Sequence, residues 1–294
     1  MPHPDEVLPP ELHVGTSSWA TDDWVGPFYP PGTRPGDYLA HYSTRFSTVE
    51  IDSTWYRAPS ARLVDGWREK TPPGFLFSAK VPRTITHEKA LVGCGEEMAD
   101  FLTAMERLGE KLGPLLFQFE YVAKGKDAAE YASGAEFLSR LEPFLAALPQ
   151  GHRYVVEVRN EGWLSPRLMD ILRRNRVALA LNDYFTMPPI DRFLEKSDPG
   201  TADFLYVRFL GHHRLMDARV RKAVEQGSRE REWGALALDR TREMERWVPA
   251  IQELLRRRVP IFAYFNNHYA GYAPGSIDLF LQVWKHLRAK EPGA

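Results

Sequence analysis

The feature that most constrains the fold of this 294-residue chain is a repeated alternation of short apolar runs with longer helical stretches. Short apolar runs predict β-strands, and a helix between consecutive strands favours parallel pairing. Eight such runs occur: Leu12–Trp19, Thr48–Asp52, Phe75–Lys80, Leu115–Glu120, Tyr154–Arg159, Val177–Asn182, Phe204–Leu210 and Ile261–Asn267. The sequence therefore predicts an α/β fold, namely a closed (β/α)8 barrel of the TIM type.

Length and composition agree with a single barrel domain. Barrels of this type typically have about 250 residues, and 44% hydrophobic residues are enough for a sizeable core. We expect residues 1–11 to be a disordered, proline-rich lead-in and residues 12–290 to form the barrel. An insertion is expected near 212–238, as a solvated helix rather than a mobile lid. The segment 121–131 is expected to be a polar loop.

Charge and targeting patterns limit the partners. A net charge of −1 gives no overall attraction to nucleic acid or to anionic membranes, although a local basic patch is compatible with it. The N-terminal residues lack the basic and apolar blocks of a signal peptide, and no apolar run reaches membrane-spanning length. We therefore expect a cytoplasmic protein without a membrane partner. Cys94, the single cysteine, is interpreted as structural.

Alternation along the strands predicts a polar interior at one end of the barrel. Successive side chains in a strand face opposite sides, so Val49 and Ile51 would face helices while Glu50 and Asp52 point inward. The same argument directs a further polar set inward: Ser17, Trp19, Ser78, Lys80, Gln118, Glu120, Glu157, Arg159, Asn182, Tyr206, Arg208, Tyr264 and Asn266. These residues fall near the C-terminal ends of the strands, where the active sites of this fold lie.

Several segments at these strand ends resemble a known family. They are GTSSWATDDWVGPFYP, FSTVEIDSTWYRAPS, FLFSAKVPRTITHEKAL, GPLLFQF, VVEVRNEGW, YVRFLGHH and YFNNHYAGYAP. As a set they are similar to the "domain of unknown function 72" family, also called YecE-like. The resemblance runs from about Leu12 to beyond the eighth strand and implies a TIM-type barrel. It implies no reaction.

Four positions depart from the pattern of that family. Ser18 stands where glycine is usual, Glu120 where proline is usual, and Leu210 and Asn160 where histidine is usual. The family's polar positions are otherwise kept: Glu50, Lys80, Gln118, Glu157, Arg159, Arg208, Asn266 and Asn267. A mechanism that needs a histidine on the fifth or seventh strand is therefore in doubt, although His212 and His213 lie nearby.

The inward charges suggest both binding and catalysis. Arg159 and Arg208 with Lys80 would bind an anionic or polyhydroxylated ligand. Glu50 and Glu157 are the candidate general acid and base, and Lys80 is a third candidate catalytic residue. Ligand-binding positions are expected at Ser17, Trp19, Asp52, Tyr56, Gln118, Arg159, Trp163, Asn182, Asp183, Arg208, Asn266, Asn267 and His268. Alternatively, the charges form an internal salt-bridge network in which each glutamate only orients a neighbouring cation.

Aromatic residues follow several strand ends: Trp19, Trp24, Trp55, Tyr56 and Trp163. Aromatic rings at a barrel mouth can stack on a sugar or a base, whereas the alternative is that they pack the loops.

A metal site and a Schiff base are further alternatives. Glu50, Glu157, Asp183, His212 and His268 can converge across the mouth on a divalent metal, although no HxH or HExxH spacing is present. A Schiff-base role for Lys80 requires a lowered pKa. No glycine-rich phosphate-binding or Rossmann motif occurs, so we expect no nucleotide cofactor.

The function hypothesis is a hydrolase, lyase or isomerase that acts on an anionic or sugar-like substrate. The alternatives are a metal-dependent protein acting on phosphodiesters or nucleic acid, and a nonenzymatic module that binds a ligand or nucleic acid.

Overall fold

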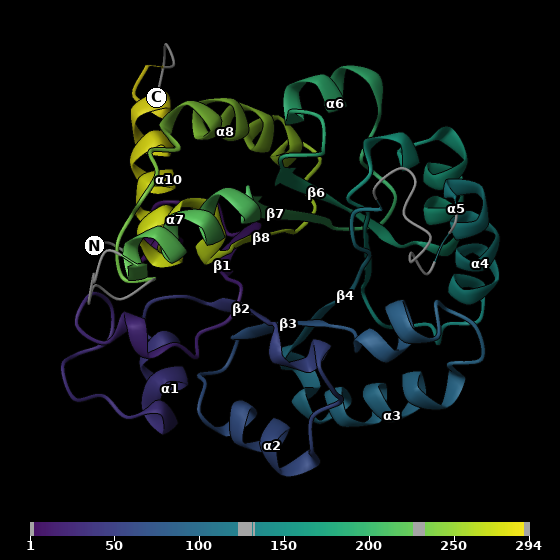
Figure 1. Cartoon of the computed structure of the whole chain (residues 1–294), viewed down its shortest axis with the longest axis horizontal. Coiled ribbons are helices and arrows are strands. Elements are labelled where there is room, and N and C mark those ends of the chain that lie inside the picture. Colours follow the sequence, from purple (N-terminus) through teal and green to yellow (C-terminus); the bar gives the residue numbers. More distant parts are fainter. Residues whose placement is uncertain (1–2, 123–130, 132, 226–232, 291–294) are drawn as a thin grey trace.

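The computed structural model describes residues 3–122, 131, 133–225 and 233–290, and it confirms the predicted TIM-type barrel. Eight parallel strands form one sheet in the order β1-β8-β7-β6-β5-β4-β3-β2, and helices surround them (Figure 1). The strands are β1 Leu12–Thr16, β2 Thr48–Ile51, β3 Leu76–Lys80, β4 Leu112–Gln118, β5 Tyr154–Glu157, β6 Ala178–Tyr184, β7 Leu205–Gly211 and β8 Ile261–Phe265.

Ten α-helices occur within the described residues. They are α1 Tyr38–Tyr42, α2 Ala61–Glu69, α3 Gly95–Met105, α4 Gly134–Ala146, α5 Pro166–Asn175, α6 Ile190–Lys196, α7 His213–Glu225, α8 Thr241–Leu255, α9 Asn267–Ala270 and α10 Ala273–Arg288. Local sequence explains several helix starts. Ser60, Ser133 and Ser165 cap α2, α4 and α5, because each hydroxyl accepts a hydrogen bond from a backbone N–H of the first turn.

The barrel closes where β1 meets β2. Ser17 and Glu50 form a parallel bridge, and the backbone N–H of Ser18 donates to the Glu50 carbonyl over 2.8 Å. Gly15 makes this approach possible, since a Cβ there would lie 2.1 Å from the Thr48 carbonyl oxygen.

Strand alternation divides the core into two layers. Outward residues such as Val49, Phe117 and Val207 pack against the helices in the larger apolar cluster. A smaller cluster fills the barrel interior at the end where the strands start. It consists of Leu116, Val155, Ala178, Ala180, Phe204, Tyr206, Phe262 and Tyr264. The polar inward residues continue this interior layer towards the C-terminal ends of the strands, as the alternation predicts.

Two expectations about inward residues were wrong. Trp19 packs outward against Trp67 and Phe77, with ring centroids 5.8 and 6.4 Å apart. Alternation fails because Ser18, just before it, has a left-handed backbone with φ of 77°, the conformation that explains the family's usual glycine. Glu120 lies beyond the end of β4, and 60% of its side chain is exposed beside His87.

The N-terminal segment also differs from expectation. Residues 3–11 are described and include a 3-10 helix at Pro4–Glu6, and Leu8 is buried against the core, so disorder is not found over these residues.

In the stretch expected as a helical insertion, His213–Glu225 is helical as α7, whereas residues 233–238 form turns, bends and irregular backbone. Most of the loop expected at 121–131 lies outside the described residues. No helix in the described part of the chain is long and apolar enough to cross a membrane.

Candidate functional site

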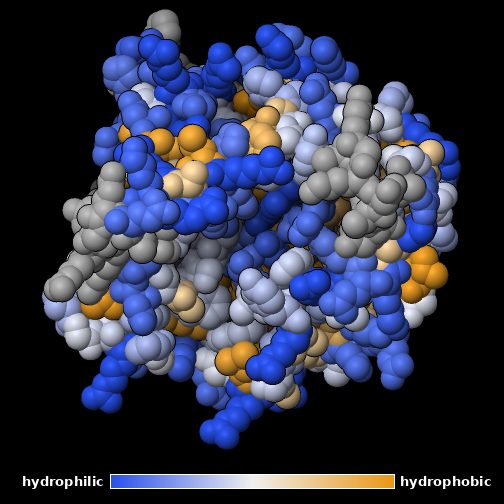
Figure 2. All heavy atoms as spheres, in the orientation of Figure 1, coloured by the Kyte–Doolittle hydropathy of each residue, from blue (hydrophilic) through white to orange (hydrophobic). Residues whose placement is uncertain are grey.

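The C-terminal ends of the strands bring most of the predicted polar residues together at one face, here called the mouth. Figure 2 shows a face that is hollowed near its middle, with hydrophilic residues in the hollow. Glu50, Glu157 and Arg208 lie deepest, and each is fully buried. Asp52, Lys80 and Arg159 lie one alternation step further out along their strands.

Arg208 is the centre of the buried charge network. Its guanidinium donates to both carboxylate oxygens of Glu50, with Nε to Oε2 at 2.9 Å and Nη2 to Oε1 at 2.6 Å. Its third nitrogen, Nη1, donates to Oε2 of Glu157 over 2.5 Å. The Tyr206 hydroxyl also donates to Glu50 over 2.6 Å. Glu50 therefore fixes Arg208 from β2 across the barrel and has no oxygen without a partner.

Glu157 joins this network to Arg159. Its second oxygen, Oε1, accepts from Arg159 Nε over 2.7 Å. Burial alone would raise the pKa of Glu157, but Arg208 and Arg159 outweigh it and lower that pKa to about 2. A general acid needs a raised pKa, so the geometry favours the alternative in which Glu157 orients cations. Its partners are Arg159 and Arg208, whereas Lys80 belongs to a different pair.

Lys80 and Asp52 form the outer, more accessible ion pair. Lys80 Nζ lies 2.5 Å from Asp52 Oδ1, and their side chains are 11% and 37% exposed. Burial opposes ionisation of Asp52, but Lys80 followed by Arg208 and Arg159 lowers the pKa of its carboxyl below the usual value. Because β2 and β3 are neighbours, the strand register places this pair at one side of the mouth.

Arg159 has unused hydrogen-bonding capacity. Its Nε is bound to Glu157, and its guanidinium carbon lies 4.8 Å from the centre of the Tyr184 ring. Among the described residues its Nη1 and Nη2 have no hydrogen-bond partner, although only 8% of the residue is exposed. Two parallel N–H donors in one plane match a carboxylate or phosphate.

Four further buried polar atoms at the mouth lack a hydrogen-bond partner within the described part of the chain. They are Ser17 Oγ, Gln118 Nε2, Asn182 Oδ1 and His213 Nε2. They belong to four different segments around the barrel, the ends of β1, β4 and β6 and the start of α7. Buried polar groups without partners are uncommon in folded proteins and indicate an absent water or ligand.

The charges of the mouth balance. Glu50, Glu157 and Asp52 oppose Arg208, Arg159 and Lys80 in contacts of 2.9 Å or less. The expected positive field is thus reduced, because each cation of the mouth is opposed by a carboxylate.

Besides Trp19, two predicted ligand-binding residues, Asp183 and Trp163, lie apart from the mouth, and Tyr56 lies at its rim. Asp183 faces the helices, where its Oδ2 accepts from Trp247 Nε1 and the Tyr269 hydroxyl over 3.1 and 3.2 Å, and burial raises its pKa. The Trp163 ring stacks on Phe137 with centroids 4.6 Å apart and is loop packing. Tyr56 is 67% exposed beside Trp55 at the rim.

The loop after β8 serves local structure first. Asn266 caps α9 by accepting from the backbone of His268 over 2.9 Å, and Asn267 accepts from the backbone of Ala273 over 2.9 Å. His268 lies over the mouth and stacks on His213 with centroids 4.4 Å apart.

Two residues of the mouth, Tyr184 and His213, were missing from the predicted site. Tyr184 is two residues beyond Asn182 on β6 and so has the same facing. The strand was expected to end at 182, and extending it would have found Tyr184. Burial, with Arg159, His268 and Arg208, lowers the pKa of His213 to about 3, so its imidazole is neutral at neutral pH.

The five residues expected to converge on a metal do not gather. Asp183 faces away, and His212 accepts from the backbone of Leu215 at the start of α7 over 3.1 Å. Over the described residues, no cluster of three or more His, Cys, Asp or Glu side chains is arranged to hold a metal ion. A metal bound in another arrangement stays a prediction.

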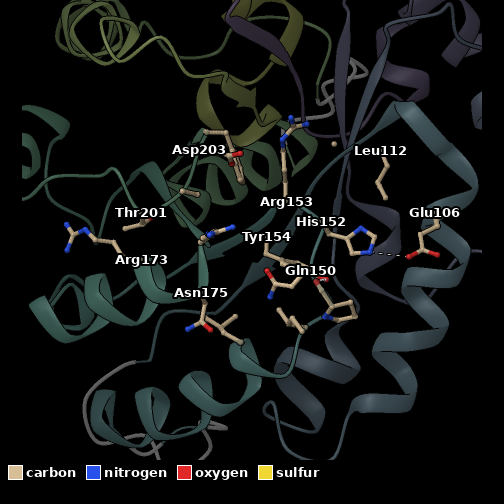
Figure 3. Close-up of a pocket in the computed structure, with 18 of the residues that line it drawn as sticks. Glu106, Leu112, Gln150, His152, Arg153, Tyr154, Arg173, Asn175, Thr201 and Asp203 are labelled. Carbon is tan, nitrogen blue, oxygen red and sulfur yellow. Dashed lines mark hydrogen bonds and ion pairs between the residues drawn. The ribbon is translucent and has the colours of Figure 1, made fainter.

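A separate groove lies at the opposite, N-terminal end of the barrel, beside β4 to β7. Its volume is about 990 Å³, and Arg153, Arg173 and Arg176 are among its lining residues. Figure 3 shows Arg153 and Arg173 on different sides of it, with the 3.1 Å ion pair of His152 and Glu106 at one edge. The predicted polar residues do not line this groove.

The closed parallel barrel with a polar C-terminal mouth defines the class as a TIM-type barrel protein. The family model described as "Protein of unknown function DUF72" matches residues 13–293, and the chain belongs to this family. This confirms the resemblance seen in the strand-end segments.

Curated relatives support the assignment. UPF0759 protein YecE of Escherichia coli is 32% identical over 150 residues, which are 51% of this chain and 48% of YecE, so the chain matches about half the length of that relative. UPF0759 protein YunF of Bacillus subtilis is 25% identical over 302 positions, covering 92% of this chain and all of YunF.

Solved structures agree with the fold. A DUF72 family protein from Thermotoga maritima is 28% identical with a TM-score of 0.68, and the match covers 94% of this chain and 99% of that one. A DUF72 family protein from Enterococcus faecalis, 21% identical with a TM-score of 0.65 over 93% of this chain and 95% of its own, shows the fold alone.

Proposed function

We propose that the mouth binds a small anionic or sugar-like molecule and that the protein is an enzyme of the hydrolase, lyase or isomerase type acting on it. The observation that carries the proposal is the free end of Arg159, together with four unpartnered buried polar atoms on other segments of the barrel. A ligand with a carboxylate or phosphate would satisfy the two Arg159 donors. Gln118 Nε2 donates and Asn182 Oδ1 accepts, which suits hydroxyl groups.

The rigid support of Arg159 also favours binding. A guanidinium that must bind a ligand needs a fixed orientation, and Glu157 holds it from one side while the Tyr184 ring lies against it. Glu157 in turn is held by Arg208 and through it by Glu50. The buried network thus preorganises a binding group, which lowers the entropy lost when a ligand binds.

For catalysis, Lys80 and Asp52 are better candidates than the two glutamates. Both glutamates are saturated by arginine, whereas the Lys80–Asp52 pair is partly exposed and holds a proton donor next to a proton acceptor. In this proposal Glu50 and Glu157 are positioning residues.

Action on nucleic acid, or on phosphodiesters with a metal, has less support. A phosphate backbone is bound by several cations at once, and at the mouth each cation is opposed by a carboxylate.

Calorimetry with matched sugars tests the proposal. Glucuronate, glucose and glucose 6-phosphate would be titrated into the wild type, Arg159→Ala and the control Arg153→Ala, which alters the groove at the other end. We expect Arg159→Ala to weaken binding of the anionic sugars at least about tenfold, as for loss of a charge-assisted hydrogen bond. We expect Arg153→Ala to bind like the wild type.

The contrary outcomes are distinct. Equal affinity in the wild type and Arg159→Ala, or loss only in Arg153→Ala, would place binding elsewhere. Turnover followed by NMR in the wild type and in Lys80→Met tests the enzymatic part, which fails if both proteins act alike.

A further inference from the structure

His268 is held in a geometry that only its protonated form satisfies. Asn266 Oδ1 accepts from the backbone N–H of His268, which fixes this atom as the oxygen, and the same oxygen lies 2.9 Å from His268 Nδ1. On the other side of the ring, Nε2 lies 3.2 Å from Asp217 Oδ1. Both ring nitrogens therefore face acceptors, and only an imidazolium has a proton on each.

The second acceptor belongs to α7, which follows the C-terminal end of β7 (Figure 1) and packs beside α9. Two contacts of His268 join these helices at the mouth, the stacking on His213 and the 3.2 Å contact of Nε2 with Asp217 Oδ1. In a neutral imidazole with the proton on Nδ1, the Nε2 lone pair would face the carboxylate of Asp217. In the other neutral form, with the proton on Nε2, the Nδ1 lone pair would face Asn266 Oδ1. A neutral ring therefore satisfies only one of the two contacts, whereas the charged ring satisfies both and attracts Asp217 more strongly.

The charge of Arg159 opposes that protonation. Burial lowers the pKa of His268, Asp217 and Asp52 raise it, and Arg159 lowers it. His213 on α7 and the Trp233 ring, with its centroid 4.7 Å away, complete the surroundings of His268. An anion bound to the free end of Arg159 would cancel the charge that disfavours the imidazolium. A neutral ligand at the same place would not.

We propose that binding of an anion at Arg159 is coupled to protonation of His268, which closes α7 onto the mouth through Asp217. The inference rests on the proposed function, because it needs a ligand at Arg159, and it narrows the ligand class to molecules with an anionic group. The proton comes from solvent, and the bound anion offsets the new positive charge. His213 stays neutral beneath the ring, so the stacked pair carries a single charge.

Linkage gives the sign of the effect. A site that takes up a proton on binding has higher affinity at lower pH, over the range between the free and the bound pKa of that group. The Kd for an anion should therefore fall as the pH is lowered from about 8 to about 6, by up to about tenfold per unit, while the Kd for a neutral ligand should not change.

The experiment measures the Kd of glucuronate and glucose across this pH range, together with the pKa of His268 from the NMR signals of labelled histidine. We expect glucuronate to raise the pKa of His268 and glucose to leave it unchanged. His268→Gln should abolish the pH dependence of glucuronate binding, and Asp217→Asn should reduce it, while exposed His286→Gln serves as the control.

Three outcomes are separable. A rise in the His268 pKa with glucuronate but not with glucose, together with a weaker pH dependence in Asp217→Asn, supports the coupling. Glucuronate binding that is sensitive to Arg159→Ala but independent of pH would overturn the coupling and leave the proposed function standing. Absence of any Arg159-dependent binding would overturn both.

Discussion

The side chains of Glu50 and Glu157 illustrate how a charged residue in a barrel interior can serve structure before chemistry. Both are fully buried, and both are hydrogen-bonded on each oxygen. The desolvation of such charges is costly unless every atom is paired, and here the pairing is complete. Their role at the mouth is to hold two guanidinium groups, and in Arg159 both Nη1 and Nη2 have no hydrogen-bond partner among the described residues.

Glu157→Gln tests that role through acid stability. A carboxyl whose pKa is lowered in the folded state stabilises the protein above its unfolded pKa, and the contribution is lost as the pH falls through the folded value. For Glu157 the loss falls between about pH 4.5 and pH 2 and amounts to about 3 kcal/mol. We expect Glu157→Gln to lower the free energy of unfolding at neutral pH by that order and to flatten its fall in acid.

Chemical denaturation at a series of pH values provides the measurement. Glu142→Gln, which removes an exposed partner of Arg174, is the control and should change little. Equal acid sensitivity of wild type and Glu157→Gln would contradict the account of the network.

For individual residues, the sequence predicted well which way a side chain faces, but it predicted poorly which residues that side chain contacts. Alternation placed Glu50, Lys80 and Glu157 correctly, because it depends only on strand geometry. It could not show that Arg208 joins β2 to β5, since those contacts depend on how far each side chain reaches across the barrel. It failed at Trp19, where the left-handed backbone at Ser18 reverses the facing.

Among the elements, the β1–β2 pair determines whether the barrel closes. The strands approach so closely at Gly15 that a methyl group has no space beside the Thr48 carbonyl. The Ser17–Glu50 bridge lies two residues further on, so the same contact sets the position of the Glu50 side chain. The contact that closes the sheet therefore also places the buried charge network of Glu50 and Arg208.

Gly15→Ala tests the contact between β1 and β2 that closes the barrel. A Cβ 2.1 Å from a carbonyl oxygen must force the strands apart. We expect a loss of about 3 kcal/mol or more in the free energy of unfolding, together with weaker anion binding, because Arg208 loses its anchor on Glu50.

Gly36→Ala is the matched control, since a Cβ there would meet no atom within 4 Å. Thermal unfolding measures the stability of both variants, and calorimetry measures their anion binding. A Gly15→Ala protein as stable as Gly36→Ala would show that closure tolerates the added methyl.

For helices too, some features can be predicted from the local sequence and others cannot. The sequence pattern of a helix start, a serine cap followed by proline, is visible at Ser165 and Pro166, where α5 begins. A proline inside a helix usually kinks or divides it, yet α8 runs from Thr241 to Leu255 with Pro249 inside it. Burial of Met244, Trp247, Val248, Ile251 and Leu254 on one face compensates for the lost backbone hydrogen bond. Tertiary packing of this kind is not visible in a local pattern.

For the whole molecule, one end of the barrel is filled for stability and the other end carries the proposed binding site. Apolar residues fill the end from which the strands start, and the charged and polar set occupies the end at which they finish. The fold and the facing of this set followed from one repeated pattern in the sequence. The ligand did not, because unpartnered donors such as Gln118 Nε2 appear only once every other contact is known.

The central claim is that the mouth around Arg159 is the ligand site, and a crystal structure of the protein soaked with glucuronate tests it most directly. We predict the glucuronate carboxylate within hydrogen-bonding distance of Nη1 and Nη2 of Arg159, with hydroxyl groups on Gln118 or Asn182. Glucuronate bound instead in the groove lined by Arg153, with the mouth empty, would contradict the account.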